Sequence, residues 1–167
     1  MLISLDCETT GLDLVHGAKP FLVTTCELGE QDDIVRYWEW SVNPLTRIPT
    51  IPIGDLENII NLIESAELIY LHNSKFDVRA LATIGVTLPW HKVRDTLVAG
   101  HLLGSNHKHD LTSMVRDYLG RDIEKYEMSI KEVTKVARAI VKKDYPDWRI
   151  AEQGEAHMPS VRESSKR

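Results

Sequence analysis

Two acidic residues, Asp6 and Glu8, flank a single cysteine at the end of a short apolar segment, Leu2–Asp6. The segment has the length and composition of a buried strand, and side chains two residues apart in a strand point the same way. Both carboxylates should therefore face one site at the rim of a sheet. Two carboxylates so close together resist joint ionisation unless a cation offsets their charge. Oxygen ligands suit Mg²⁺ or Mn²⁺ rather than zinc. The competing interpretation is that the two acids only form a turn or cap a helix.

A second acidic element, His72–Asp77, has the sequence His-Asn-Ser-Lys-Phe-Asp. It follows another short apolar segment, Leu68–Leu71, and places Asp77 in the first turn of a predicted helix. A carboxylate there is also favoured by the helix dipole, and Asn73 and Ser74 could serve only as helix caps. Two acidic elements, each placed directly after an apolar strand, favour a shared metal site over these separate explanations.

The segments around the acids predict the sheet that must hold them. Apolar runs indicate strands at 2–6, 20–28, 34–42, 68–71 and 91–94. Helices are predicted near 55–63, 74–83, 95–103, 110–120 and 129–143, with Asp55, Ser74, Asp95 and Ser129 as N-caps. This order is typical of the α/β class, with a mixed five-stranded sheet of three antiparallel strands followed by a β–α–β unit, flanked by helices.

The composition predicts a soluble domain without a membrane partner. Hydrophobic residues make up 43% and charged residues 27% of the chain, and no apolar run approaches the ~20 residues of a membrane span. We expect a cytoplasmic protein, since the chain starts without a signal-peptide pattern. The domain is predicted over residues 1–150, with 151–167 as a polar tail or the start of a continuing region. The net charge of −5 argues against binding nucleic acid by counterion release alone, unless some acids hold cations.

The stretch Asp6–Asp13 reads Asp-Cys-Glu-Thr-Thr-Gly-Leu-Asp. Together with His72–Asp77 it resembles the first two motifs of the DEDD superfamily of 3′–5′ exonucleases, most closely those of the proofreading domain of family-A DNA polymerases. The likeness extends over residues 2 to 120. It implies an RNase H-like fold and hydrolysis of the terminal phosphodiester of DNA, assisted by two Mg²⁺ or Mn²⁺ ions.

The same resemblance implies a role for each motif residue. Asp6 would bridge both metal ions, Glu8 would hold the ion that activates water, and Asp77 would serve the second ion. The implied partners are a single-stranded DNA 3′ end and, as one option, a polymerase domain in the same or another chain. For Leu12 and Phe76 the alternative role is ordinary core packing. The residues implied to line the pocket for the terminal nucleotide are Thr9, Thr10, Gly11, Leu12, Asn73 and Phe76.

The third motif of this family, Tyr-x-x-x-Asp or His-x-x-x-x-Asp, has no convincing match. Tyr118 and Asp122 have the spacing, but Tyr118 fits better as the end of the preceding helix. Asp144 and Asp147 are expected in a turn. We therefore expect the third motif C-terminal to residue 167, which would leave this chain a weak metal binder and a slow hydrolase or none.

Cationic residues could contact a phosphate backbone. Lys75 and Arg79 flank the proposed site, and Lys131, Lys135, Arg138 and Lys142 share one face of a predicted helix. The alternative for both sets is a solvated surface. Two other functions stay open: a non-catalytic nucleic-acid-binding module with an incomplete site, and a related exonuclease that acts on RNA.

Overall fold

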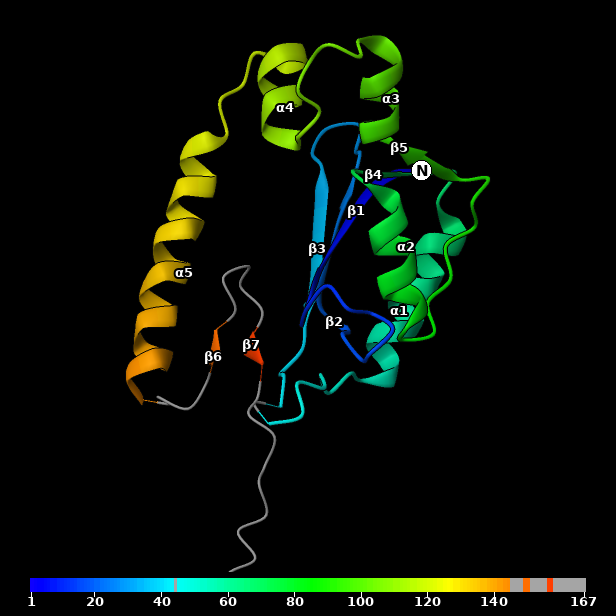
Figure 1. The fold of residues 1–167 in the computed structure, drawn as a ribbon. Coiled ribbons are helices and arrows are strands. Elements are labelled where there is room, and N and C mark those ends of the chain that lie inside the picture. Colours follow the sequence, from blue (N-terminus) through cyan, green and yellow to red (C-terminus); the bar gives the residue numbers. More distant parts are fainter. Residues whose placement is uncertain (44, 145–148, 151–155, 158–167) are drawn as a thin grey trace, which may run out of the picture. The chain divides into compact units, whose positions relative to one another are not determined.

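A mixed five-stranded sheet organises the first part of the chain in the computed structural model (Figure 1). The structure describes residues 1–43, 45–144, 149–150 and 156–157. Contacts within the chain define two compact units, Met1–Leu111 and Thr112–Arg167. The sheet and both acidic motifs belong to the first unit.

The five strands occur in the spatial order β3-β2-β1-β4-β5. Their bounds are β1 Leu2–Thr9, β2 Pro20–Glu27, β3 Ile34–Glu39, β4 Leu68–Leu71 and β5 Val93–Asp95. The first three strands pair antiparallel, whereas β4 is parallel to β1 and β5 is parallel to β4. The structure therefore confirms the predicted α/β class and its sheet of three antiparallel strands followed by a β–α–β unit.

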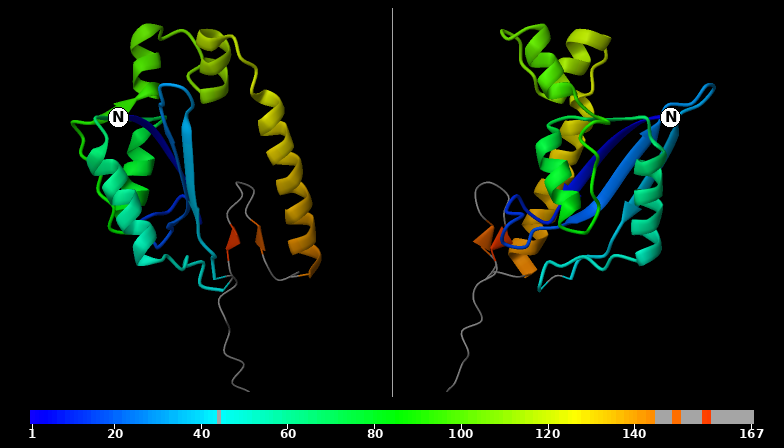
Figure 2. Two further views of the ribbon diagram at one scale, coloured as in Figure 1. Left: turned by 180° about the vertical axis from the view of Figure 1, so that it is seen from behind. Right: turned by 90° about the vertical axis from the view of Figure 1, so that its right-hand side faces the viewer.

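Two helices, α1 (Ile53–Ser65) and α2 (Ser74–Ala82), cover the same face of this sheet (Figures 1 and 2). A third helix, α3 (Thr96–Leu103), follows β5 directly. The core lies between the sheet and the first two helices. Its fully buried members include Ile3, Ile59, Ile63, Ile69 and Leu81.

Burial alternates along β1 as the pleat of a strand requires. Leu5 and Cys7 are buried in the core, whereas Asp6 and Glu8 are exposed. The two acids therefore share one face of β1, as their spacing predicted, and it is the face that points away from the core.

Three of the predicted N-cap residues are wrong. Asp55 is not the N-cap of α1, because the helix starts after Pro52, and the Asp55 carboxylate instead accepts a hydrogen bond from the Trp40 indole at 2.9 Å. Ser74 is the first residue of α2 rather than its cap, which is Asn73. Ser129 lies within a longer helix, and its hydroxyl donates to the Lys125 carbonyl four residues back.

The predicted strand ends also differ by a few residues. β1 continues to Thr9, three residues beyond the predicted end, because its pairing with β2 persists. β3 ends at Glu39, and the next residue, Trp40, is buried with 4% of its surface exposed. Hydrophobic alternation continues through Trp40, so the sequence pattern alone did not reveal that end.

The second unit contains α4 (Leu111–Leu119), whose first residue closes the first unit, and α5 (Glu124–Asp144). α4 ends as predicted: Gly120 follows it with a φ of 63°, the left-handed conformation that glycine adopts easily after a helix. A two-stranded antiparallel pair, β6 (Arg149–Ile150) and β7 (Ala156–His157), follows. The rest of the predicted tail, 151–155 and 158–167, lies outside the described residues. Among the residues described, no helix is long and apolar enough to span a membrane.

Candidate metal and nucleotide site

The C-terminal half of β1 has one open edge. β1 pairs with β4 only over Leu2–Ser4, whereas its pairing with β2 continues to Thr9. The register shifts between Glu8 and Thr9, which is an irregularity of the β-bulge type. Such bulges bend a strand and re-aim its side chains. β1 therefore presents its acids where it has separated from β4.

Asp77 occupies this open edge. Its side chain extends from the first turn of α2, and the residue is only 4% exposed. Asp77 Oδ1 accepts a hydrogen bond from the Cys7 backbone N–H at 3.2 Å and another from the Cys7 thiol at 3.1 Å. The carboxylate is therefore fixed beside the residue that separates Asp6 from Glu8.

The three carboxyl groups hinder one another's ionisation. The side chains of Asp6 and Glu8 reach solvent, but the surrounding protein partly desolvates their carboxyl groups. This desolvation raises the pKa of Asp6, although the Cys7 N–H and nearby His72 oppose the rise. The pKa of Glu8 is raised by desolvation and then by the charges of Asp6 and Asp77. Burial also raises the pKa of Asp77, the Cys7 hydrogen bonds oppose this, and the charge of Asp6 adds to it. A divalent cation would remove this electrostatic penalty.

Cys7 is a hydrogen-bond donor here rather than a metal ligand. Burial and the neighbouring Asp77 raise the pKa of its thiol far above the ordinary range, so the sulfur stays protonated. The donor set around residues 6 to 8 is therefore made of carboxylate oxygens, which fits Mg²⁺ or Mn²⁺. The described residues contain no group of three or more His, Cys, Asp or Glu side chains already arranged to hold an ion.

Asp95 fixes the start of α2, and with it Asp77. In the β4–β5 ladder Asp95 pairs with Leu71, so it lies beside the point where the chain leaves β4 for α2. Burial alone would raise the pKa of Asp95, but the hydrogen bonds from the second motif and from α3 outweigh it and lower the pKa. Its carboxylate accepts from the backbone N–H of Asn73 (3.2 Å), Ser74 (2.8 Å), Leu97 (2.9 Å) and Val98 (3.4 Å), and from the Ser74 hydroxyl (2.7 Å).

Sequence analysis identified Asp95 correctly as the cap of α3 but missed its bonds to the second motif. The available signal was its position at the end of a strand predicted to run parallel to 68–71. The carboxyl ends of parallel strands meet at one edge of a sheet.

Asn73 adopts a left-handed backbone conformation with φ 67° and ψ 49°. This conformation is uncommon outside glycine, although asparagine tolerates it better than most residues. The Asn73 side chain makes no capping bond to the helix. It lines a pocket instead, so one of the two alternatives for Asn73, a side-chain cap, does not apply.

This pocket of about 490 Å³ lies between α2 and the loop after β1. Leu12, Asn73 and Phe76 line it, which brings together three of the six residues predicted for the nucleotide. Leu12 is 65% exposed, so core packing does not explain it. Phe76 both lines the pocket and packs against the core. The other lining residues are Asp13, Leu14, Val15, Lys75, Arg79 and Thr83.

The remaining three predicted residues, Thr9, Thr10 and Gly11, shape the loop after β1. The Thr9 hydroxyl donates to the Gly11 carbonyl at 2.7 Å. Thr10 is buried, and its hydroxyl accepts from the Lys19 N–H at 3.1 Å. A Cβ added at Gly11 would meet only the Ala18 Cβ, at 3.7 Å, so packing within the described chain does not require glycine there.

Two cationic side chains hold this loop in place, and sequence analysis did not single them out. Lys19 Nζ donates to the Thr83 carbonyl at the end of α2, at 2.8 Å. Arg47 donates to the Thr10 carbonyl. Neither contact leaves a local pattern, because each joins residues more than thirty positions apart.

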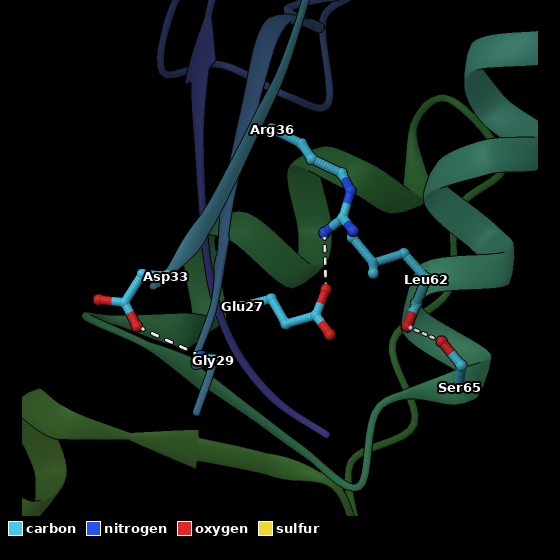
Figure 3. A network of polar contacts seen from close by, with 6 residues as sticks. All are labelled: Glu27, Gly29, Asp33, Arg36, Leu62 and Ser65. Carbon is cyan, nitrogen blue, oxygen red and sulfur yellow. Dashed lines mark hydrogen bonds and ion pairs between the residues drawn. The ribbon is translucent and has the colours of Figure 1, made fainter. Parts of the chain in front are cut away.

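A separate cavity of about 800 Å³ lies between β3 and α1 and contains no residue of either acidic motif. Its cation, Arg36, donates to Glu27 on the neighbouring strand at 2.9 Å (Figure 3). On the other wall the Ser65 hydroxyl donates to the Leu62 carbonyl at 2.9 Å. Because its charges are paired, this cavity offers less to a charged ligand than the pocket beside α2.

The described third-motif candidates lie in helices or at the start of one. Tyr118 lies in the last turn of α4, as expected. Asp122 accepts a hydrogen bond from the Glu124 N–H at 2.9 Å, where α5 begins. Asp144 is the last residue of α5, so the expectation of a turn is wrong for this residue, and Asp147 lies outside the described residues.

The chain matches a known protein family over most of its length. A family model described as 3′–5′ exonuclease matches residues 2–143. No curated protein sequence matches the chain. Similar solved structures include Brucella melitensis NrnC with bound Mg²⁺, at 22% identity and a TM-score of 0.54, covering 73% of this chain and 55% of that one. Another is Brucella melitensis NrnC bound to pGG, at 22% identity and a TM-score of 0.52, covering 73% and 54%. At this identity the likeness shows the fold, and the chain spans about half the length of the structures that it matches.

Proposed function

The chain belongs to the 3′–5′ exonuclease family, and we propose that Asp6, Glu8 and Asp77 hold the divalent ions with which it cleaves the terminal phosphodiester of a DNA strand. The observation that carries this proposal is the pair of hydrogen bonds from Cys7 to Asp77, which joins the two acidic motifs. The raised pKa values of the three carboxyl groups support it, because a bound cation would relieve their repulsion.

The position of Asp6 suits a bridging ligand. Its charge raises the pKa of both Glu8 and Asp77, so it lies within electrostatic reach of each. Two ions held by these carboxylates would supply an activated water molecule and stabilise both the attacking and the leaving oxygen. We assign Glu8 to the ion on the water side and Asp77 to the other. Cys7 orients Asp77 by donating two hydrogen bonds to a single carboxylate oxygen.

The pocket beside α2 suits the terminal nucleotide. Leu12 and Phe76 offer apolar surface to a base or a sugar, and Asn73 offers an amide donor and acceptor. Thr9, Thr10 and Gly11 shape the loop that carries Leu12. In this proposal they support the nucleotide pocket through the backbone of that loop.

We further propose that the strand is DNA and that the chain has a proofreading role beside a polymerase domain. It is supported by the likeness of Asp6–Asp13 to the first motif of family-A polymerase proofreading domains. The similar structure bound to pGG supports a nucleic-acid strand as the partner without deciding its sugar. Matched deoxyribo- and ribo-oligonucleotides decide this point, because a site must read the 2′-hydroxyl to distinguish them.

The test is the shortening of a 5′-labelled single strand. We expect a ladder of products that lose nucleotides from the 3′ end with Mg²⁺ or Mn²⁺ and none with EDTA. Asp6→Ala plus Glu8→Ala should reduce the rate by about 10³-fold or more, since the metal ions contribute several kcal/mol to transition-state stabilisation.

The matched control is Glu30→Ala plus Asp32→Ala, which removes the same charge from the exposed β2–β3 connection. This variant should shorten the strand at the wild-type rate. Shortening that needs no metal, or that survives the loss of Asp6 and Glu8, contradicts the proposed site. A strand left intact under all conditions, both by the wild-type chain and by a chain extended past residue 167, favours the non-catalytic binding module.

A further inference from the structure

Two cationic side chains of α2, Lys75 and Arg79, line the pocket beside that helix. They are four residues apart, so they lie on one face of the helix. Both are exposed, and within the described part of the chain neither takes part in a hydrogen bond or an ion pair. Arg36 differs, because it is paired with Glu27 at 2.9 Å.

The same pocket has a large apolar wall. Leu12 is 65% exposed and Val15 is 89% exposed, although both side chains are apolar. The pocket's acid, Asp13, is already engaged: its carboxylate contacts the His16 ring at 2.6 Å and the His16 N–H at 3.1 Å. Unpaired cations beside exposed apolar surface match a nucleotide, which combines an anionic phosphate with an apolar base face.

The cations and the metal site lie on different sides of α2. Lys75 precedes Asp77 by two residues and Arg79 follows it by two, and two residues turn a helix by about 200°. Asp77 is buried against β1, whereas Lys75 and Arg79 are exposed. A phosphate bound by the two cations is therefore not the phosphate that is cut at Asp6, Glu8 and Asp77.

We propose that Lys75 and Arg79 form a subsite for a second, uncleaved phosphate of the nucleic-acid strand. This inference rests on the proposed function, because it takes the strand to be the ligand of the neighbouring acidic site. The phosphate comes either from an internal linkage on the 5′ side of the cut or from a phosphorylated 3′ end. Both sources present anionic phosphate oxygens to the two cations: an internal diester carries one negative charge, and a terminal monoester carries up to two.

The first test measures binding without catalysis. A fluorescein-labelled hexathymidylate is titrated with the chain in EDTA, and its dissociation constant is followed from about 50 to 200 mM salt. Lys75→Ala plus Arg79→Ala should weaken binding roughly tenfold at low salt and flatten the log–log salt dependence by about 0.7 per lost phosphate contact. Lys75→Arg plus Arg79→Lys, which keeps both charges, should bind nearly as the wild type does.

The matched control is Arg94→Ala plus Lys108→Ala, which removes two exposed cations of the first unit that do not line the pocket. Its salt dependence should remain closer to the wild type. A double variant at Lys75 and Arg79 that behaves like this control overturns the inference, as does a wild-type chain that binds no strand.

The second test identifies the phosphate. Neutral methylphosphonate is placed at one linkage at a time, and a further strand carries a 3′-phosphate. An internal source predicts that one methylphosphonate position weakens wild-type binding but leaves the double variant unaffected. A terminal source predicts that the 3′-phosphate strengthens wild-type binding only. Equal sensitivity of both proteins to every modification contradicts the subsite.

Hydrolysis is measured separately, so that the two proposals fail independently. A p-nitrophenyl ester of thymidine 5′-phosphate has only the phosphate that is cut, so its kcat/KM should fall less in the double variant than the kcat/KM of an oligonucleotide. With an oligonucleotide the double variant should raise KM and leave kcat nearly unchanged. If no substrate is cut but binding still depends on Lys75 and Arg79, the proposed function fails and the subsite stands.

Discussion

Asp95 and Asp77 are both aspartates close to the end of a parallel strand, yet their environments are opposite. Asp95 accepts hydrogen bonds from the second motif and from the start of α3, and these bonds lower its pKa. Asp77 accepts from Cys7, but burial and the nearby Asp6 still raise its pKa. The difference shows that residue type and position do not separate an acid that the chain stabilises from one that the chain leaves destabilised. The separation depends on whether the chain itself supplies enough donors to stabilise the charge.

The largest effect should come from removing Asp95, the compensated acid, whose charge is stabilised by hydrogen bonds from the chain. Asp95→Ala leaves the N–H groups of Asn73 and Ser74 without their acceptor and removes the cap of α3. A lost cap costs about 1 kcal/mol, and each of the two lost backbone hydrogen bonds, which are exposed or partly buried, costs about 1 kcal/mol. We expect a stability loss of about 3 kcal/mol, or roughly 10 °C in the melting temperature. Thermal unfolding followed by circular dichroism measures it.

Asp32→Ala is the control for this experiment, since Asp32 is an exposed aspartate of the β2–β3 connection. It should change stability by less than about 0.5 kcal/mol. Equal melting temperatures for the Asp95 and Asp32 variants would remove the distinction between compensated and uncompensated acids.

A smaller change in stability, of opposite sign, should follow from removing Asp6 and Glu8, the uncompensated acids, whose raised pKa values show that their charges are not fully stabilised. The pKa values of Asp6 and Glu8 are raised in the folded chain above their ordinary values of 3.8 and 4.5. Between the ordinary and the raised values the folded state binds more protons than the unfolded state, so stability falls as pH rises. Above that interval the penalty is fully present. Asp6→Asn plus Glu8→Gln should therefore melt a few degrees higher than the wild type at neutral pH in EDTA.

The pH profile supplies the control for this second prediction. The difference between wild type and variant should shrink as the pH falls toward the ordinary carboxyl range, where the wild-type acids become protonated. Exposure of both side chains and screening by salt keep the effect modest. A wild type that is the more stable protein at neutral pH in EDTA would contradict the raised pKa values.

The smallest effect should come from substituting Cys7, which donates hydrogen bonds to Asp77 from its backbone N–H and its thiol. Cys7→Ala removes the thiol donor but keeps the backbone donor to Asp77. Loss of a residue that orients a ligand typically costs 10–100-fold in metal affinity, and because one donor remains we expect roughly tenfold. Calorimetric titration with Mn²⁺ measures the change. Cys7→Ser restores a side-chain donor, so its Mn²⁺ affinity should lie between those of the wild type and Cys7→Ala. An unchanged Mn²⁺ affinity in Cys7→Ala would show that the thiol does not position Asp77.

The sheet and the shared face of Asp6 and Glu8 could be predicted from the sequence, because both follow from short periodic patterns. The bounds of β4 are those predicted, and the strand period of two places both acids on one side. The helix starts were harder, since a Ser or Asp near an apolar run resembles a cap whether or not its side chain makes one. Asp55 instead binds the Trp40 indole. Such a partner depends on the tertiary fold and not on local spacing.

The contacts that hold the candidate site could not be predicted from local sequence patterns either. The left-handed conformation of Asn73 is stable because Asp95, twenty-two residues later, accepts its N–H. Arg47 reaches the Thr10 carbonyl from a different loop. The motif letters therefore indicated which residues to consider, whereas the parallel register and the loop packing determined how they are held.

The most direct test of the account is whether Asp6, Glu8 and Asp77 share a divalent cation. Titration with Mn²⁺, followed by the loss of the free-ion signal in electron paramagnetic resonance, measures this without substrate. The wild type and a Glu30→Gln plus Asp32→Asn control should both bind Mn²⁺, whereas Asp6→Asn plus Glu8→Gln and Asp77→Asn should each lose that binding. Binding of equal strength in the wild type and both site variants, or no binding in any of the proteins, would contradict the account.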